Sequence, residues 1–254
     1  MRQGAPDRQR RAHLIRRPLS KELARRFPEL AGEAEQLIAA GAVHVDGLPA
    51  TNPRTLVDAS ASVRVAGEER ALRGRAKLAA ALEGFGIDAT GAVALDAGAA
   101  AGGFVQALLD AGARRVYAVE AGFGQLLGSL AQDERVVNLE RTNVGALDRE
   151  LVPDALDLVS LDVGYLPLAT AVPQLSAALA FAPGAELVGL VKPKDELGLG
   201  ELPADAESAA AAAIAKASEG IAAAGWDVVA TMPSPVTGSR GAVEALLHAR
   251  RAAA

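Results

Sequence analysis

From residue 93 onward, short apolar runs alternate with longer segments in which apolar residues recur at helical spacing. The runs predict strands at 93–97, 115–119, 135–139, 157–162, 186–191, 227–232 and 243–249. The segments between them predict helices at 103–112, 123–132, 168–181 and 205–224. Such alternation is typical of an α/β fold with a mostly parallel sheet, which binds ligands at the carboxyl ends of its strands.

The first 67 residues follow a different pattern. "ELAGEAEQLIAAG" predicts a helix that stops at Gly41, and Asp46-Gly47 is a hairpin turn pair between alternating segments. "TLVDASASVRV" predicts one further short strand. We therefore expect a disordered basic arm at 1–12, a small α/β domain at 13–67, a linker with an amphipathic leading helix at 68–92, and the large domain at 93–254.

Charge is distributed unevenly along the chain. The net charge is −5, but residues 1–77 carry +6 and the remainder carries −11. The basic end is therefore the surface suited to a polyanion, and the alternative is a solvated arm without a partner. The candidate phosphate contacts are Arg8, Arg10, Arg11, Arg16, Arg17, Arg25 and Arg26.

Composition narrows the class of protein. The chain has no cysteine and three scattered histidines, so we expect neither a disulfide framework nor a metal site. No apolar run is long enough for a membrane span, and the first twenty residues lack the apolar core of a secretory signal. The expectation is a cytoplasmic protein without a membrane partner.

A glycine-rich turn follows the first strand of the large domain. Asp96 ends that strand, and the loop reads D-x-G-x-x-x-G-G with Gly98, Gly102 and Gly103. Its spacing differs from the G-x-G-x-x-G of dinucleotide enzymes, which disfavours a nicotinamide-dependent oxidoreductase. Glu120 ends the next strand, where a carboxylate can accept both hydroxyls of a ribose. The pattern predicts a nucleoside site, and the alternative is that these glycines only form tight turns.

Four charged residues are predicted to meet at one edge of the sheet. Asp162 and Lys192 each end a strand, and Glu244 joins them if the last strand runs antiparallel to the others. Lys77, from the leading helix, could lie over the same edge of the sheet. A lysine acts as a base near neutral pH only if desolvation or a second positive charge lowers its pKa. The group could activate a hydroxyl for attack on an electrophile; alternatively, each residue is an ordinary ion-pair partner.

Seven segments, in order along nearly the whole chain, resemble the hemolysin A (TlyA) family. They are "RGRAKLAAALEGFGID", "LDAGAAAGGF", "VYAVEAGFGQL", "RVVNLERTNV", "DLVSLDVGYLPL", "LVKPK" and "SPVTGSRGAVEALL". Members are S-adenosylmethionine-dependent ribosomal RNA 2′-O-methyltransferases with an FtsJ-like catalytic domain after an S4 RNA-binding domain. The resemblance implies a Rossmann-like seven-stranded methyltransferase fold, S-adenosyl-L-methionine as cofactor, ribosomal RNA or a ribosomal subunit as partner, and a cytidine ribose as target.

The resemblance also assigns site residues. It implies a catalytic tetrad of Lys77, Asp162, Lys192 and Glu244, in which Lys192 is the base for the 2′-hydroxyl and the other three tune and orient it. It places the cofactor at Asp96, Gly98, Gly102, Gly103, Phe104 and Asp162, with Glu120 at its ribose and Asn143 near its adenine.

The S4-like part departs from the family pattern, with "VDG" for the usual "VNG" and "NP" for "KP", and so do three segments of the catalytic part. "LRGRAKL" stands for the usual "SRGGxKL", "GAVEALL" for "GNxEFLL", and "KPKDE" for "KPQFE", which places Lys194 and Asp195 beside Lys192. Asp195 is expected to raise the pKa of Lys192, against a role as base. The departures motivate an alternative hypothesis: an RNA-binding or ribosome-assembly module that keeps the methyltransferase fold with weak or lost catalysis.

Overall fold

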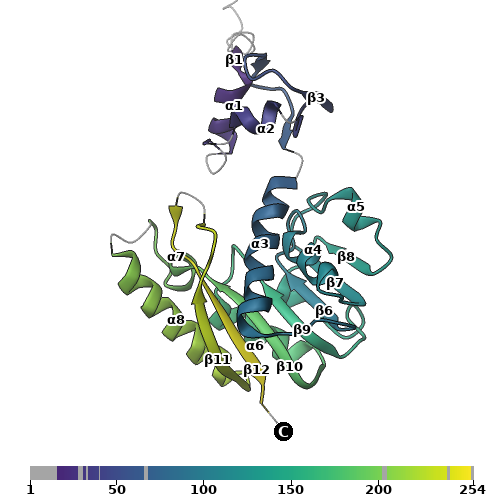
Figure 1. The fold of residues 1–254 in the computed structure, drawn as a ribbon, viewed down its shortest axis with the longest axis vertical. Coiled ribbons are helices and arrows are strands. Elements are labelled where there is room, and N and C mark those ends of the chain that lie inside the picture. Colours follow the sequence, from purple (N-terminus) through teal and green to yellow (C-terminus); the bar gives the residue numbers. More distant parts are fainter. Residues whose placement is uncertain are drawn as a thin grey trace, which may run out of the picture. The chain divides into compact units, whose positions relative to one another are not determined.

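The computed structural model describes residues 16–27, 31–32, 34–39, 41–65, 68–201, 205–238 and 241–252. The chain divides into two compact units, Met1–Gly67 and Glu68–Ala254 (Figure 1). The arm expected at 1–12, with Arg8, Arg10 and Arg11, lies outside the described residues. Among the helices of the described ranges, none is long and apolar enough to cross a membrane.

The first unit is a small α/β structure. Its described elements are β1 (Arg16–Pro18), α1 (Leu19–Arg26), α2 (Ala34–Ala39), β2 (Val43–Val45), β3 (Leu48–Ala50), β4 (Leu56–Asp58) and β5 (Val63–Val65). The strands form a three-stranded sheet, β3-β2-β5, and a separate β1-β4 pair. The hairpin at Asp46-Gly47 is confirmed, because both residues have positive φ, 50° and 85°.

Strand β1 was not predicted, and neither were two other features of this unit. One is helix α1, whose Leu19 and Leu23 pack with Leu37 and Ile38 of α2 in the core. The other is the division of "TLVDASASVRV" into two strands. Asp58 causes the break, since its carboxylate accepts hydrogen bonds from the backbone N–H and the hydroxyl of Ser60 and so closes a local turn.

The second unit contains the predicted seven-stranded sheet. Its strands are β6 (Val93–Ala97), β7 (Arg115–Glu120), β8 (Val136–Glu140), β9 (Leu156–Leu161), β10 (Phe181–Val191), β11 (Trp226–Pro233) and β12 (Ala245–Arg251). Their order is β11-β12-β10-β9-β6-β7-β8. Strand β12 runs antiparallel to both of its neighbours, whereas the pairs from β10 to β8 are parallel.

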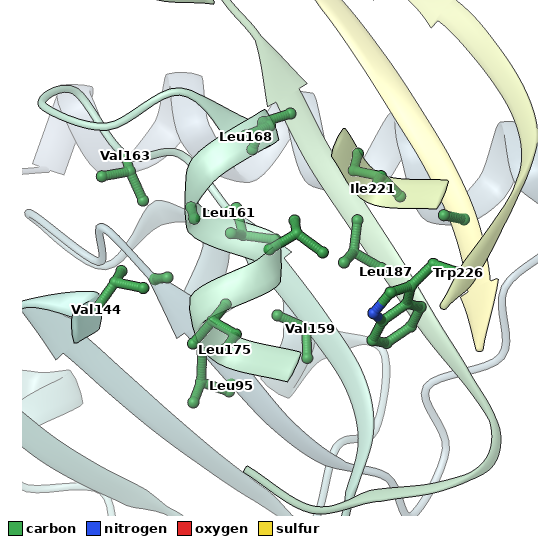
Figure 2. Close-up of a cluster of buried hydrophobic side chains, with 14 of the residues drawn as sticks. Leu95, Val144, Val159, Leu161, Val163, Leu168, Leu175, Leu187, Ile221 and Trp226 are labelled. Atoms are coloured by element: carbon green, nitrogen blue, oxygen red, sulfur yellow. The ribbon is translucent and has the colours of Figure 1, made fainter. Parts of the chain in front are cut away.

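Helices cover both faces of this sheet. They are α3 (Glu68–Phe85), α4 (Gly103–Asp110), α5 (Gly128–Ala131), α6 (Leu168–Ala178), α7 (Pro193–Glu196) and α8 (Ala206–Ala223), with a 3₁₀ turn at Val144–Ala146. Alternate strand residues face opposite ways, so β9 sends Val159 into the core beneath α6 and α8, and Leu158 into the core beneath α3 and α4. Figure 2 shows the first of these cores, where Leu161, Leu187, Ile221 and Trp226 lie together.

Several predicted boundaries were wrong. The helix expected at 123–132 reduces to α5, because Gly124 has a φ of +66° and its N–H donates to the Glu140 carboxylate at 2.9 Å, which fixes a loop. Strand β10 begins at Phe181, five residues earlier than expected, and β12 begins at Ala245, after Glu244. The expected linker is already helical from Glu68, and α7 was not predicted.

Candidate active site

Asp162 and Lys192 follow the neighbouring parallel strands β9 and β10 at their carboxyl ends. A salt bridge joins Lys192 Nζ to the Asp162 carboxylate, and the same Nζ donates to the Val163 carbonyl oxygen at 3.5 Å. The two charged side chains are 20% and 28% exposed, so the pair remains accessible to a substrate. The predicted convergence of these two residues is confirmed.

Lys77 and Glu244 form a second and more deeply buried ion pair. Lys77 lies on α3 and Glu244 immediately precedes β12, and their Nζ and Oε2 atoms are 2.6 Å apart. Both side chains are less than 10% exposed. Because β12 is antiparallel, its first residues lie at the edge where β9 and β10 end, as the sequence argument required. The structure thus brings all four predicted residues to one edge of the sheet.

The electrostatic surroundings of Lys192 favour its charged form. Burial alone lowers the pKa of this lysine, but the carboxylates of Asp162, Glu244 and Asp195 outweigh burial and hold the pKa above its ordinary value. The sequence argument required a lowered pKa for a base, and in this structure the shift is the opposite one. Lys192 is therefore a cation near neutral pH. Asp195 raises the pKa of Lys192, as expected from the sequence.

The glycine loop lies directly against the segment that carries Asp162. Gly98 has a φ of +90°, and a Cβ at this position would stand 2.4 Å from the Asp162 carbonyl oxygen. Only glycine fits such a conformation and such a close approach. Gly102 also has a positive φ, +92°, and leads into α4. These two glycines allow the loop between β6 and α4 to pack closely, Gly98 against the Asp162 backbone and Gly102 against the side chains of Leu126 and Leu130.

Two other residues assigned to the cofactor have structural roles here. A Cβ on Gly103 would meet the Ala71 carbonyl oxygen at 2.5 Å, so this glycine permits close packing of α4 against α3. The Phe104 side chain is 3% exposed and packs in the core beneath these helices. Phe104 therefore anchors the start of α4 from inside, rather than presenting its ring at the surface.

Asp96, at the end of β6, is a buried acid with one unused oxygen. Ser160 donates its hydroxyl to Asp96 Oδ1 at 2.7 Å, while Asp96 Oδ2 is buried and has no hydrogen-bond partner among the described residues. Burial, helped by the nearby charges of Asp162 and Glu120 and opposed by Ser160, raises the pKa of Asp96 to about 8. The side chain is therefore mainly neutral at pH 7.

Glu120 organises the loops that face the glycine turn. Its Oε2 accepts from the Ala100 N–H at 3.0 Å and its Oε1 from the Gly122 N–H at 2.6 Å. Asn143 lies three residues after the end of the neighbouring strand β8 and is exposed, and its neighbour Thr142 donates its N–H to the Glu120 carbonyl oxygen at 3.0 Å. Both predicted nucleoside contacts thus lie at the carboxyl ends of β7 and β8.

A cavity of about 100 Å³ opens beside Lys192 and Glu244. Its remaining lining residues are Pro193, Lys194, Ala206, Gly241, Ala242 and Val243. Sequence reasoning did not foresee this cavity. It also missed Glu196, which is 2% exposed and binds the first turn of α6. No local sequence signal marks a carboxylate whose partners are backbone groups of a helix 27 residues away.

In the first unit, three arginines surround one buried carboxylate. Glu22 is fully buried and accepts hydrogen bonds from Arg17, Arg25 and Arg26, and the Arg25 bond is the main cause that lowers the pKa of Glu22 to about 2. Arg26 also donates to the carbonyl oxygens of residues 59 and 61, so it is committed to the fold. Arg17 and Arg25 keep exposed side chains that can reach a phosphate.

Comparison with known proteins finds a matching family for each of the two units. The FtsJ-like methyltransferase family matches residues 71–251, and the S4 domain matches residues 17–63. The 16S/23S rRNA (cytidine-2′-O)-methyltransferase TlyA of Mycobacterium tuberculosis is 40% identical over 94% of this chain and 88% of its own length. Hemolysin A of Brachyspira hyodysenteriae is 30% identical over 87% of this chain and 94% of its own. A solved structure of a hemolysin candidate from Streptococcus thermophilus aligns with a TM-score of 0.72, at 27% identity, over 93% of this chain and 89% of that one.

Proposed function

The chain belongs to the hemolysin A (TlyA) family of FtsJ-like methyltransferases, and we propose that it methylates the 2′-hydroxyl of a cytidine ribose in ribosomal RNA. S-adenosylmethionine is the cofactor and supplies an electrophilic methyl group on its sulfonium. The observation that carries the proposal is the meeting of two ion pairs, Lys192–Asp162 and Lys77–Glu244, at the sheet edge next to the glycine loop.

The residues of the glycine loop fit this cofactor. Gly98 and Gly102 both have a positive φ, so the loop that follows β6 can turn tightly at the carboxyl end of the strand, where ligands of such sheets bind. Asp96 offers a buried oxygen that no described group satisfies, as expected of a site completed by a ligand or a bound water. Glu120 and the exposed Asn143 extend the site along the ends of β7 and β8 and would hold the nucleoside half.

Lys192 acts on the ribose hydroxyl. As a cation in the resting enzyme it donates a hydrogen bond to the 2′-oxygen, which orients that oxygen; once it has released one proton to water, the neutral amine can accept the proton of the hydroxyl. Asp162 holds Lys192 in place, and the buried Lys77–Glu244 pair holds the start of β12 against α3. Because the pKa of Lys192 is raised, the rate is expected to increase with pH into the alkaline range.

RNA is held in part by the first unit. An S4 domain with exposed Arg17 and Arg25 provides a sequence-independent and salt-sensitive contact to phosphates. The RNA sequence around the target is not read by such contacts, so the choice of nucleotide falls to the groups around Lys192. The cavity beside Lys192 and Glu244 lies where a target ribose would meet Lys192.

The test uses the full chain with purified small and large ribosomal subunits from cells that lack the gene, and with S-adenosylmethionine labelled on its methyl group. Label should enter rRNA at a cytidine 2′-oxygen, mapped by reverse transcription at low nucleotide concentration. Lys192→Ala should abolish transfer and leave cofactor binding, measured by calorimetry, nearly intact. Glu207→Gln, an exposed charge on α8, is the control and should behave as wild type.

Two outcomes would contradict the proposal. Unchanged transfer by Lys192→Ala would remove the assigned base. Failure of the wild-type chain to bind S-adenosylmethionine, while still binding ribosomal subunits, would favour the alternative of an RNA-binding or assembly module with lost catalysis.

A further inference from the structure

Glu196 caps the amino end of helix α6, although it lies outside that helix. Helix α6 begins after Pro167, which provides no side-chain cap, so its first N–H groups need an outside acceptor. Glu196 Oε2 accepts from the Leu168 N–H at 2.8 Å and Oε1 from the Ala169 N–H at 3.0 Å. The side chain is 2% exposed. Both carboxylate oxygens are therefore used, at the end of the helix dipole that favours negative charge.

Helix α8 holds the same junction from the other side. The ammonium group of Lys216 donates a hydrogen bond to the Glu196 carbonyl oxygen at 2.5 Å. One turn later, Gly220 lies so close to α6 that an added Cβ would stand 2.5 Å from Ala169 Cα. These contacts hold the backbone of Glu196 and the first turn of α6 against the same helix, α8.

Strand β10 contacts the first turn of α6 as well. A Cβ on Gly189 would meet the Leu168 side chain at 2.6 Å, so Leu168 lies directly on the strand that ends in Lys192. Figure 2 shows Leu168 at the start of α6, in the same core cluster as Leu161. The start of α6 is thus held by α7, α8 and β10 together.

The two segments that meet at this junction carry the Lys192–Asp162 pair. Lys192 precedes α7, and its carbonyl oxygen accepts from the N–H groups of Asp195 and Glu196 at 3.0 and 2.9 Å. Asp162 lies six residues before Leu168 on the segment that leads into α6. We propose that Glu196 is a positioning residue of the methyl transfer, which fixes Lys192 relative to Asp162 by joining α7 to the start of α6. This inference rests on the proposed function.

Replacing Glu196 with glutamine isolates the contribution of the carboxylate. The amide oxygen keeps one of the two bonds, but the amide nitrogen faces a second N–H donor and cannot accept from it. Asp162 stays in place, since its N–H donates to the Ala97 carbonyl oxygen at 2.9 Å and its backbone abuts Gly98, so Lys192 is the member that shifts. We expect kcat to fall roughly 10- to 100-fold, as small misplacements of catalytic groups do, with unchanged affinity for S-adenosylmethionine.

The pH profile separates positioning from a general loss of folded protein. Lys192 faces the carboxylates of Asp162, Asp195 and Glu244, and Asp162 contributes most of the rise in its pKa. When Lys192 moves away from Asp162, the acidic limb of kcat should shift to lower pH. A merely destabilised enzyme would lose the same fraction of its rate at every pH. Unchanged kcat in Glu196→Gln, or a uniform loss without a shift, would overturn the proposal.

Two further variants and one direct readout complete the experiment. Lys216→Met leaves the carboxylate in place and should lower kcat less than Glu196→Gln, and Glu207→Gln should match wild type. Titration of Lys192 by NMR of isotope-labelled lysine, assigned with Lys192→Arg, should show a lower pKa in Glu196→Gln without any RNA. If the wild type methylates no RNA, the proposed function fails, whereas an unchanged Lys192 titration in Glu196→Gln overturns the role of Glu196.

Discussion

Replacing Asp96 with asparagine tests the electrostatics of the site without removing a contact. Asp96 has a folded-state pKa of about 8 against an ordinary value of 3.8. Because the folded-state value is raised, the associated stability is fully present below pH 3.8 and is lost as the pH rises toward 8. Asparagine resembles the protonated acid in shape and has no charge to desolvate. The variant should therefore gain stability relative to wild type as the pH rises.

The magnitude follows from the pKa difference. Between pH 5 and 7 the unfolded acid is ionised and the folded acid is protonated, so wild type loses about 1.4 kcal/mol of unfolding free energy per pH unit relative to the variant. From pH 5 to 7 the difference amounts to about 3 kcal/mol. Urea denaturation followed by fluorescence of Trp226, the single tryptophan, measures it, because Trp226 is buried in the same unit as Asp96.

The comparison between variant and wild type cancels all other titrating groups. Asp227→Asn, at an exposed aspartate next to Trp226, is the control for the loss of one negative charge near the fluorescent residue. If the unfolding free energies of Asp96→Asn and wild type run parallel from pH 5 to 7, Asp96 is ionised in the folded protein. The account of its burial would then be refuted.

Other experiments test the buried ion pair, the glycine loop, the first unit and the proposed base. Lys77→Met or Glu244→Gln alone should each cost about 3–5 kcal/mol in urea denaturation, because each leaves a buried charge unpaired, and the double variant should cost less than their sum. Gly98→Ala should abolish binding of S-adenosylmethionine by calorimetry and destabilise the second unit by at least about 1–3 kcal/mol, owing to its positive φ and the contact with the Asp162 segment. Glu22→Gln should speed amide hydrogen exchange in α1 at pH 7 by tenfold or more, since it weakens charge-assisted bonds from Arg25 and Arg26. Wild-type methyl transfer should rise with pH above 7, and a rate that falls there would exclude Lys192 as the base.

The sheet could be predicted from the sequence because its signal is local. Buried parallel strands such as β6 and β9 are mainly apolar, and each is followed by a charged or glycine-rich turn. The failures lie where tertiary contacts override local pattern. The segment after Glu120 has helical spacing, yet hydrogen bonds to the carboxylates of Glu120 and Glu140 hold most of it as a loop.

The site also combines features that could be predicted from local pattern with features that depend on tertiary contacts. The edge shared by Asp162, Lys192 and Glu244 follows from strand direction alone, once β12 runs antiparallel. The effect of neighbouring residues on the pKa or the orientation of each side chain could not be predicted. Lys192 carries a raised pKa because three carboxylates converge on it, and Phe104 lies in the core cluster that α3 and α4 share.

The departures near Lys192 bear on whether catalysis has been lost. Asp195, which the family pattern lacks, does favour the charged lysine, but it contributes less than Asp162 or Glu244. The resting charge of Lys192 is therefore set mainly by the two acids that belong to the usual tetrad. A family member with glutamine and phenylalanine in place of Lys194 and Asp195 would keep the same two acids beside its lysine. Since the charge on Lys192 comes with the tetrad itself, the "KPKDE" segment gives no electrostatic reason to prefer an inactive module over an enzyme.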